Sequence, residues 1–204
     1  KLFFKINIFI HEQNSVLGRT NSFFLYFANK LFLNFDILVK IQKKFQSKTF
    51  VVGMPEKKSK KEINNNSEIP NKFTIFICGG SQGSEFLTKF AIDLIKNIEK
   101  ESIINANFII QCPKHMNEVL IKRLSGSKSK IIIQSFFNKI DEVLKETSIC
   151  VSRAGAGSIS DLINYRIPSI LMPLPTAKDN HQYFNASILE KHDLALIIDQ
   201  NKYE

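Results

Sequence analysis

The sequence predicts an α/β fold built on a parallel sheet with helices on both faces. Two observations over residues 73–204 support this prediction: short runs that are apolar throughout, and amphipathic patterns that alternate with them. A strand that is apolar along its whole length is buried on both faces, which is typical of parallel sheets. Its alternation with helices predicts βαβ units and an open α/β domain.

The individual elements follow from the same two patterns. Apolar runs predict strands at residues 73–78, 107–111, 130–135, 149–152, 169–172 and 194–198. Helical patterns lie between them at residues 85–99, 114–124, 139–146, 158–165 and 181–191. No internal repeat is visible.

The first 53 residues carry a second, shorter pattern. Strands are predicted at residues 6–10 and 48–52, and a helix at residues 18–34. The helix prediction rests on apolar residues at helical spacing, namely Phe23, Phe24, Phe27, Leu31 and Phe35. We interpret them as facing a core, with contact to a membrane as the alternative.

A polar stretch separates the two regions. Residues 55–71 read PEKKSKKEINNNSEIPN, a composition that buries little apolar surface. We therefore predict three parts: residues 1–53, a linker at residues 54–72, and residues 73–204.

The charge of the chain does not predict a nucleic-acid partner. The formal net charge is +9, but only four of the 28 basic residues are arginines. Arginine is the residue suited to bidentate recognition of phosphates and base edges. A solvated lysine surface is the preferred interpretation, and weak attraction to anionic lipid stays open.

The cysteines and the hydropathy pattern bear on the compartment. The three cysteines are far apart in apolar runs and have no metal-ligand spacing, so we predict buried free thiols, no metal and no disulfide. The opening apolar segment is too short and too interrupted to span a membrane, and it has no small-residue cleavage site. The expected location is the cytoplasm or the cytoplasmic face of a membrane.

A glycine-rich turn follows the first strand of the second region. Residues 79–84 read GGSQGS, between the strand ending at Cys78 and the helix beginning near Glu85. Glycines let the backbone approach a ligand closely, and the free N–H groups of a helix start favour a phosphate. The turn matches neither the GxGxxG fingerprint nor a P-loop, and a purely structural turn is the alternative.

A second turn of this kind, SRAGAGSISD at residues 152–161, also joins a strand to a helix. Carboxyl ends of parallel strands border one crevice, so we expect both turns to face the same ligand. Asp161 can accept hydrogen bonds from ribose hydroxyls. Alternatively, Ser158 caps the helix and Asp161 favours its dipole.

Two further loops are rich in polar groups. Residues 173–182, PLPTAKDNHQ, lead into a helix and can recognise sugar hydroxyls; the alternative is a simple connection capped by Asp179 or Asn180. Residues 11–14, HEQN, follow the first strand, and four consecutive polar side chains at a strand end are unusual for simple packing. We therefore count them as a candidate site segment, with a local turn made by Asn14 as the alternative.

Five segments in order, IHEQNSVLGRTN, VVGMP, GGSQGS, SRAGAGSISDL and PLPTAKDNHQYFNA, resemble the MurG family of bacterial N-acetylglucosaminyltransferases. The resemblance runs from about residue 11 to residue 198. It implies the GT-B architecture, in which two Rossmann-like domains face each other across a cleft and the C-terminal one holds most of the sugar nucleotide. Residues 1–53 would then be the end of the N-terminal, acceptor-side domain, and residues 73–204 an incomplete donor-binding domain.

The resemblance also implies roles at matching positions. Asn14 would contact the donor sugar or diphosphate across the cleft, and Ser81 would bind the diphosphate. Phe137 would present backbone groups to the uracil edge, and Gln182, with Asp179 and His181 nearby, would recognise N-acetylglucosamine. The helix start would lie under the diphosphate with Asp161 on the ribose, through Ala156, Gly157, Ser158, Ile159, Ser160 and Asp161.

Two positions depart from the family pattern. Asp161 stands where the family has the longer glutamate, which implies a longer or water-mediated ribose contact. Lys57 stands where the family has an arginine that reaches the nucleotide, which removes the bidentate fork and weakens a phosphate contact.

The implied reaction transfers N-acetylglucosamine from UDP-N-acetylglucosamine to lipid I, giving lipid II with inversion, without a metal or cofactor. The two turns would stabilise the diphosphate leaving group, and His11 is the candidate base. We expect a peripheral protein on the cytoplasmic side of the inner membrane, with an incomplete catalytic apparatus. The alternatives are a donor-binding subunit of a two-chain transferase and, without motif support, a UDP-sugar epimerase or another transferase of this architecture.

Overall fold

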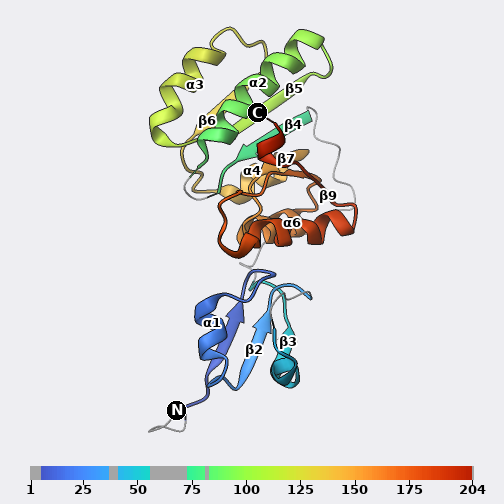
Figure 1. Ribbon diagram of the computed structural model, residues 1–204. Helices are drawn as coiled ribbons and strands as arrows, with labels where there is room; N and C mark the ends of the chain where they lie inside the picture. The colour runs from blue at the N-terminus through green and yellow to red at the C-terminus, as the bar shows by residue number, and fades with distance from the viewer. Residues whose placement is uncertain (1–5, 37–40, 56–72, 81–82, 204) are drawn as a thin grey trace.

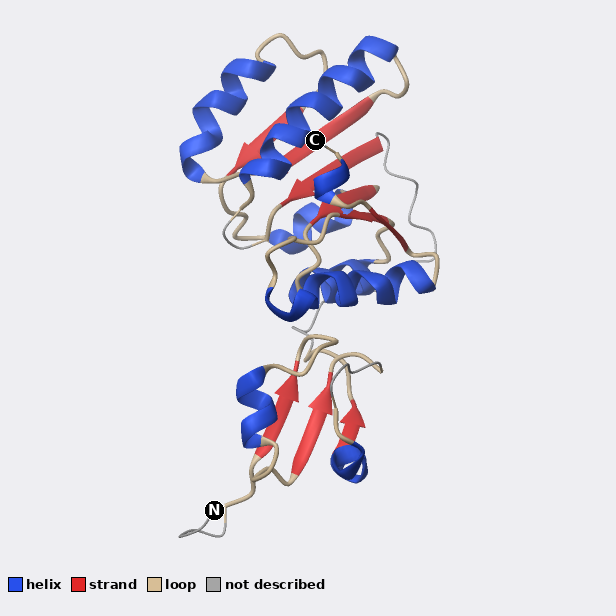
Figure 2. Ribbon diagram, in the orientation of Figure 1, coloured by secondary structure: helices blue, strands red, loops and turns tan. Residues whose placement is uncertain are grey.

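The computed structural model describes residues 6–36, 41–55, 73–80 and 83–203. The chain forms two separate sheets, one with strand order β1-β2-β3 and one with order β6-β5-β4-β7-β8-β9. Every neighbouring pair of strands in both sheets is parallel (Figures 1 and 2). The α/β class with a parallel sheet is therefore confirmed.

The first sheet is small and has one helix packed on it. Its elements are β1 (Phe9–Glu12), α1 (Arg19–Phe24), β2 (Lys30–Leu33), the 3-10 helix η1 (Lys43–Lys48) and β3 (Thr49–Val51). The strand predicted at residues 6–10 lies slightly later in the chain, because β2 pairs with residues 9–12. The strand predicted at residues 48–52 is present as β3.

The predicted helix at residues 18–34 is wrong over its second half. The helix ends at Phe24, and residues 30–33 form strand β2. In β2 the buried Leu31 and Leu33 alternate with Lys30 and Phe32, which is the period of a strand with one covered face. Four-residue spacing of apolar positions also fits this alternation, because every even spacing falls on one face of a strand.

The phenylalanines of this region do not all face a core, contrary to the prediction. Leu31 and Phe35 are buried, whereas Phe23, Phe24 and Phe27 are 63%, 48% and 42% exposed. The buried side of α1 and the following turn is formed by Leu25 and Ala28 instead.

The second sheet contains the six predicted strands in the predicted sequence positions. They are β4 (Phe73–Cys78), β5 (Ala106–Gln111), β6 (Ile131–Gln134), β7 (Ile149–Ser152), β8 (Ser169–Leu171) and β9 (Ala195–Ile197). The helices between them are α2 (Glu85–Glu101), α3 (Asn117–Leu124), α4 (Ile140–Glu146), α5 (Ala156–Tyr165) and α6 (His181–Lys191). Short 3-10 turns complete the unit at η2 (Lys114–Met116), η3 (Lys178–Asn180) and η4 (Gln200–Lys202).

Helices cover both faces of this sheet (Figure 2). One core joins α2 and α3 to the sheet and includes Ile75 and Ile77 of β4. The other core joins α4, α5 and α6 to the opposite face and includes Phe76 and Cys78 of the same strand. Because alternate residues of β4 point into both cores, residues 75–78 are all apolar, as the sequence pattern indicated; Thr74 is the buried polar residue of the strand.

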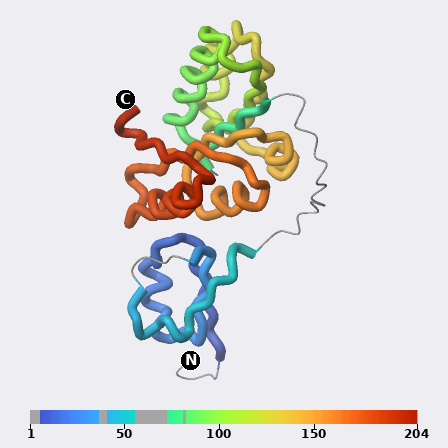
Figure 3. The backbone as a smooth tube through the Cα atoms, turned by 90° about the vertical axis from the view of Figure 1, so that its right-hand side faces the viewer, coloured from blue at the N-terminus to red at the C-terminus, as the bar shows by residue number. Residues whose placement is uncertain are grey.

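The strand order places β4 beside β7 at the centre of the sheet. From β4 the chain builds outward to β5 and β6, and from β7 it builds outward in the opposite direction to β8 and β9. The connections therefore diverge between β4 and β7, which opens a crevice at their carboxyl ends. In Figure 1 the arrow of β4 points toward the side of the smaller sheet, and β7 runs parallel to it. Figure 3 shows the smaller and the larger part of the chain from a second side.

Candidate functional site

The first glycine-rich turn leaves β4 at Cys78 and folds back on itself. A side chain at Gly79 would place its Cβ 2.3 Å from the Ser84 amide nitrogen, so a residue larger than glycine does not fit there. Gly80 and Gly83 have φ values of 81° and 72°, in the left-handed region that glycine adopts without strain. The backbone conformation of this turn thus explains its glycines.

The turn ends at the start of α2, where Ser84 is the cap residue. The Ser84 Oγ accepts a hydrogen bond from the Leu87 amide at 3.3 Å. Ser81, the phosphate ligand expected from the resemblance, lies outside the described residues.

The second turn follows β7 and opens α5 without a side-chain cap. The cap position is Gly155, and α5 begins at Ala156. Ser158 is therefore not the cap, which corrects the structural alternative weighed for it; it lies inside the first turn of the helix. The first N–H groups of an uncapped helix are available to a ligand and carry a partial positive charge.

Both turns line one polar cavity of about 530 Å³. They meet there because β4 and β7 are neighbours, as the two-turn hypothesis required. The residues lining this polar cavity are Gly79, Gly80, Gly83, Ser84, Arg153, Gly155, Gly157, Ser158, Asp161, Leu174 and Gln182.

A second, mainly apolar cavity of about 200 Å³ adjoins the first. The two cavities share Gly80, Ser158 and Asp161, so Asp161 stands at their boundary. The apolar cavity is lined by Phe76, Cys78, Gly80, Gln111, Phe136, Phe137, Ile140, Leu144, Cys150, Ser152, Ser158, Asp161 and Leu162.

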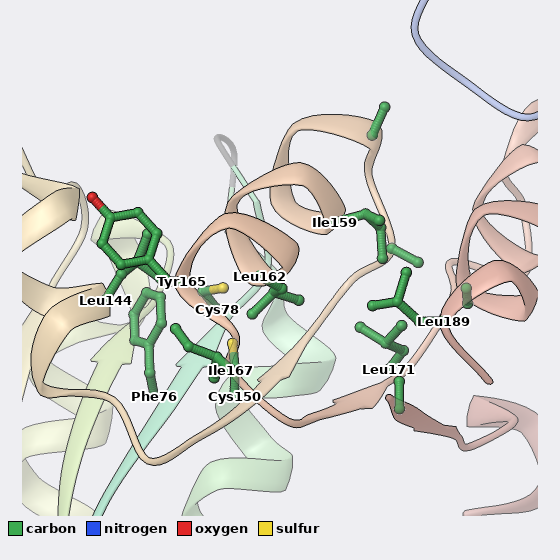
Figure 4. Close-up of a cluster of buried hydrophobic side chains, with 14 of the residues drawn as sticks. Phe76, Cys78, Leu144, Cys150, Ile159, Leu162, Tyr165, Ile167, Leu171 and Leu189 are labelled. Atoms are coloured by element: carbon green, nitrogen blue, oxygen red, sulfur yellow. The ribbon is translucent and has the colours of Figure 1, made fainter. Parts of the chain in front are cut away.

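The side chain of Phe137 contributes to the wall of this apolar cavity. Its ring meets Phe76 edge to face, with ring centroids 5.9 Å apart. Figure 4 shows Phe76, Leu144, Cys150 and Leu162 converging from β4, α4, β7 and α5. The cavity walls are therefore largely apolar side chains that pack against one another, which suit a flat and largely apolar ligand group.

The three cysteines are buried free thiols, as predicted. The neighbouring Cys78 side chain and burial both raise the pKa of Cys150 well above its ordinary value. Burial also raises the pKa of Cys112. Cys112 and Cys150 are thus protonated at neutral pH, and the Cys112 thiol donates a hydrogen bond to Asn117 Oδ1 at 2.8 Å.

Arg153 is a buried cation beside the polar cavity. The residue is only 6% exposed, and the guanidinium carbon lies 5.5 Å from the centre of the Phe86 ring. Burial lowers the pKa of Arg153, but a guanidinium stays charged in a protein. Its terminal nitrogens donate to four neutral acceptors: Met172 O (2.9 Å), Pro173 O (3.4 Å), Ser84 Oγ (3.2 Å) and Gln200 Oε1 (2.6 Å).

Asn14 lies where the smaller sheet meets α6. Its Oδ1 accepts a hydrogen bond from Asn185 Nδ2 at 3.1 Å. Asn185 is fully buried and also accepts from the Ser15 amide and the Ser15 hydroxyl, both at 2.9 Å, and donates to Ala154 O at 3.1 Å. Asn14 is therefore held one turn of α6 away from Gln182, and no described residue of the HEQN segment lines either cavity.

His11 has a structural partner. Its Nε2 forms a 2.9 Å hydrogen bond with Gly53 O, and this bond connects β1 to the chain just after β3. His11 lines neither of the two cavities. The next residue, Glu12, is 3% exposed and shapes the loop by accepting hydrogen bonds from Asn14 N, Gly18 N and Asn21 Nδ2.

The other expected site residues divide into two groups. Gly157, Ser158, Asp161 and Gln182 line the polar cavity, and the Gln182 Oε1 accepts a hydrogen bond from Leu174 N at 2.9 Å. The side chains of Ala156, Ile159 and Ser160 are buried instead: the first two lie in the core, and Ser160 Oγ accepts from Asn34 Nδ2 at 3.3 Å. Asp179 belongs to η3, and His181 Nδ1 bonds Lys178 O at 2.8 Å. Lys57 lies outside the described residues.

Sequence reasoning missed three side chains at this site. Arg153 and Ser84 lie in the two glycine-rich turns, but the sequence did not indicate that these two side chains contact each other. Asn185 lies in the quoted 173–186 segment and connects the two sheets. Only Asn185 carries a sequence signal of its own, as a polar residue between the apolar Phe184 and Ala186.

The sequence profile of the glycosyltransferase family 28 C-terminal domain matches residues 74–204. Two curated relatives are named UDP-N-acetylglucosamine--N-acetylmuramyl-(pentapeptide) pyrophosphoryl-undecaprenol N-acetylglucosamine transferase. The protein from Rickettsia prowazekii is 32% identical over 233 residues, covering 98% of this chain and 60% of that protein. The protein from Rickettsia canadensis is 33% identical over 204 residues, covering 98% of this chain and 57% of that protein. The chain thus spans about 60% of the length of these relatives.

Solved structures agree with this result. MurG of Acinetobacter baumannii superposes with a TM-score of 0.74 at 25% identity, over 97% of this chain and 55% of that one. The kitacinnamycin glycosyltransferase superposes with a TM-score of 0.62 at 13% identity, which supports the fold alone. The expected architecture of GT-B type, with two Rossmann-like sheets, is confirmed.

The profile match, the relatives along nearly the whole chain and the shared fold lead to one conclusion: the chain belongs to glycosyltransferase family 28 and, within it, to the MurG family.

Proposed function

We propose that this chain forms the donor-binding part of an inverting N-acetylglucosaminyltransferase that acts on UDP-N-acetylglucosamine and lipid I. The observation that carries the proposal is the convergence of two glycine-rich strand-to-helix turns on one polar cavity, next to an apolar cavity. In this proposal residues 73–204 are the donor-binding domain, residues 54–72 a linker, and residues 1–53 the end of the acceptor-side domain.

The two adjoining cavities match the parts of a sugar nucleotide. The apolar cavity, with Phe137 in its wall, accepts the uracil ring, and Asp161 at the boundary accepts hydrogen bonds from the ribose. The diphosphate then reaches the polar cavity at the start of α5, from Ala156 to Asp161. The amides of Ala156, Gly157 and Ser158 precede the first helical hydrogen bond, from Ile159 N to Gly155 O at 2.9 Å, and offer N–H groups to the ligand. Gln182 and Asn14 are assigned to the N-acetylglucosamine end, and Ser81 and Lys57 to the phosphates.

The chemistry that these residues supply is stabilisation of the leaving group. As the bond to the anomeric carbon breaks, negative charge grows on the diphosphate, and fixed N–H dipoles stabilise that charge. Neither cavity is lined by a histidine among the described residues. His11 keeps its hydrogen bond to Gly53 O, so we assign donor binding to this chain rather than activation of the acceptor hydroxyl.

Isothermal titration tests the donor site directly. We expect the chain to bind UDP, to discriminate against GDP because a purine overfills the apolar cavity, and to turn over lipid I slowly in a radiolabelled transfer assay. Asp161→Ala is expected to weaken UDP binding several-fold, whereas Asp93→Ala, on the exposed side of α2, leaves it unchanged. Failure of the wild-type chain to bind UDP, or equal binding of GDP, contradicts the proposal.

We also propose peripheral contact with the cytoplasmic side of the inner membrane through α1. Phe23 packs against Phe24 and Phe27, with ring centroids 5.2 and 5.9 Å apart, and all three are exposed. Lys44 stands 4.5 Å from the centre of the nearby Tyr26 ring, which adds a positive charge beside the aromatic group. Aromatic side chains next to basic ones favour the interface of an anionic bilayer. No helix in the described ranges is long and apolar enough to cross a membrane.

Vesicle flotation tests this contact. We expect the chain to float with phosphatidylglycerol vesicles, and the double variant Phe23→Ser/Phe27→Ser to remain in solution. Ile121→Ser, which removes an exposed apolar side chain from α3, serves as the control and floats like the wild type. Equal flotation of the aromatic variant contradicts the proposed contact.

One observation favours the alternative of a donor-binding subunit that works with a separate chain. Phe9, Phe32 and Phe50 form a row across the smaller sheet, with ring centroids 6.0 and 6.3 Å apart, on the face opposite α1. Phe9 and Phe50 are exposed, whereas both faces of a parallel sheet are ordinarily covered. Mixing the chain with the separately expressed acceptor-side domain of a Rickettsia relative tests this: transfer activity appears only in the mixture if the alternative holds.

A further inference from the structure

We propose that Ser84 is a direct hydrogen-bond donor to the diphosphate, and that Arg153 is the positioning residue that orients it. This inference rests on the proposed function, because it takes the polar cavity as the diphosphate site. It adds a ligand contact from the end of the first turn, separate from the expected contact of Ser81.

The argument starts from the hydrogen-bond capacity of a hydroxyl group, which has one donor and two acceptor lone pairs. Ser84 Oγ accepts one hydrogen bond from the Leu87 amide at 3.3 Å and a second from Arg153 Nη2 at 3.2 Å. Both lone pairs are therefore in use. The single O–H proton has to be donated in a third direction, and within the described ranges it has no protein acceptor.

Ser84 borders the polar cavity. Ser84 is partly exposed and lines that cavity together with the backbone of Gly80, Gly155 and Gly157. A donor that faces a cavity bordered by two helix starts, with no acceptor of its own, matches an anionic oxygen of the ligand. The two bonds that Ser84 accepts also fix its rotamer before the ligand arrives, so little rotational entropy is lost on binding.

Arg153 cannot rotate freely to bind the ligand itself, because four neutral acceptors hold its terminal nitrogens. None of the hydrogen-bond partners of Arg153 among the described residues is a carboxylate. Burying a charge without an ionic partner costs desolvation free energy. An anion in the adjoining cavity relieves that cost. Donation from a guanidinium also polarises the Ser84 hydroxyl and makes its proton a stronger donor.

A variant series at residue 84 tests the direct contact. Ser84→Ala removes the hydroxyl, and we expect the Kd for UDP to rise on the order of tenfold or more, as for loss of a hydrogen bond to a charged group. Uridine has no phosphate, so its affinity, measured by ligand-observed NMR, is expected to change less than about twofold, which is within the range of an unrelated site. Ser84→Thr keeps the hydroxyl and is expected to retain UDP binding.

Loss of the helix cap in Ser84→Ala needs a matched control. Thr88→Val provides it, because Thr88 Oγ1 donates to Ser84 O at 2.8 Å and is buried away from the cavity. Thr88→Val removes one hydrogen bond at the start of α2, and Ser84→Ala removes the two that its hydroxyl accepts, so both variants lower the melting temperature. Only Ser84→Ala is expected to weaken UDP binding.

The role of Arg153 is tested by asking whether the effect of an Arg153 substitution on UDP affinity depends on the presence of Ser84. Arg153→Gln is expected to weaken UDP binding strongly when Ser84 is present, and by a much smaller factor in the Ser84→Ala background. Arg153→Lys, which keeps the charge, is expected to restore part of the affinity. Independent, multiplicative effects of the two substitutions contradict an action of Arg153 through Ser84.

The outcomes separate this inference from the proposed function. If the wild-type chain does not bind UDP, the donor site itself is wrong and the inference fails with it. If the wild type binds UDP and Ser84→Ala binds it as tightly as Thr88→Val does, the donor site stands and the Ser84 contact is wrong.

Discussion

At the scale of single residues, the site depends on backbone positions that tolerate one residue type. Gly79 is the clearest, because its neighbour in space is the main chain of Ser84 rather than a flexible side chain. Ser84 is held in place as the cap residue of α2, so moving its main chain to make room for a Cβ costs stability. The same contact brings Ser84 close to the end of β4, so Gly79 determines where the Ser84 hydroxyl is presented.

Gly79→Ala is therefore expected to displace the turn. The added Cβ would meet backbone at 2.3 Å, so we expect a loss of about 1–3 kcal/mol in the free energy of unfolding, and UDP affinity reduced by an order of magnitude or more. Chemical denaturation and isothermal titration measure the two effects. Gly126→Ala is the control, because nothing lies within 4 Å of a Cβ built there. Unchanged UDP affinity in Gly79→Ala contradicts the assigned role of the turn.

At the scale of elements, the regular βαβ part of the chain matched its sequence pattern closely. The strands β4 and β7 and the helix α6 have the predicted limits, because each is bounded by a clear turn or cap signal. The segment around α1 did not match. Spacing by four residues fits both a helix and one face of a strand, so the pattern of residues 23–35 could not distinguish α1 followed by β2 from one long helix.

One element contact has a pH dependence. Glu99, near the end of α2, accepts hydrogen bonds from Ser127 Oγ at 2.5 Å and from the Lys128 and Ser129 amides at 3.0 Å. Partial burial by itself would raise the pKa of Glu99, but these hydrogen bonds outweigh it and lower the pKa. The carboxylate is thus better stabilised in the folded than in the unfolded chain.

The resulting stabilisation is complete above the pKa that Glu99 has in the unfolded chain. It disappears as the pH falls through the lower pKa of the folded state. Glu99→Gln is expected to lower the melting temperature slightly at pH 7, with the difference from wild type vanishing toward about pH 3, below the usual glutamate range. Glu101→Gln, on the exposed end of the same helix, is the control, and a pH-independent difference for Glu99→Gln contradicts this reasoning.

At the scale of the whole molecule, the smaller sheet and the larger one are joined by a few polar contacts. Asn185 makes three of them from a fully buried position, two to Ser15 and one to Asn14, and its fourth hydrogen bond goes to Ala154 O within the larger unit. Asn34 and Ser160 make a further one. These contacts place the HEQN segment beside the helix that carries Gln182.

Asn185→Leu keeps the number and branching of the side-chain heavy atoms and removes all four hydrogen bonds. Buried partners left without a hydrogen bond cost about 1–3 kcal/mol each when they stay dry. We expect a lower melting temperature and faster hydrogen exchange in β1 and β2, with β4 and β7 unchanged. Asn34→Ala removes a single, less buried contact between the sheets, to Ser160 Oγ, together with a local hydrogen bond to Gln13 O, and is expected to show a smaller effect. Equal exchange in wild type and Asn185→Leu contradicts the role of Asn185 in joining the two sheets.

The sequence by itself determined the parallel α/β class, the positions of the strands in residues 73–204 and the two turns that border the site. These features depend on local patterns: continuous apolar runs, glycines at strand ends and helix starts. The tertiary structure alone decided that β2 is a strand, that His11 is held by Gly53, and that Arg153 meets Ser84 across 69 residues of chain. Such contacts join residues that are distant in sequence, and the residues around one partner do not indicate which residue the other will be. Arg153 and Ser84, for example, meet only because β4 and β7 are neighbours in the folded sheet.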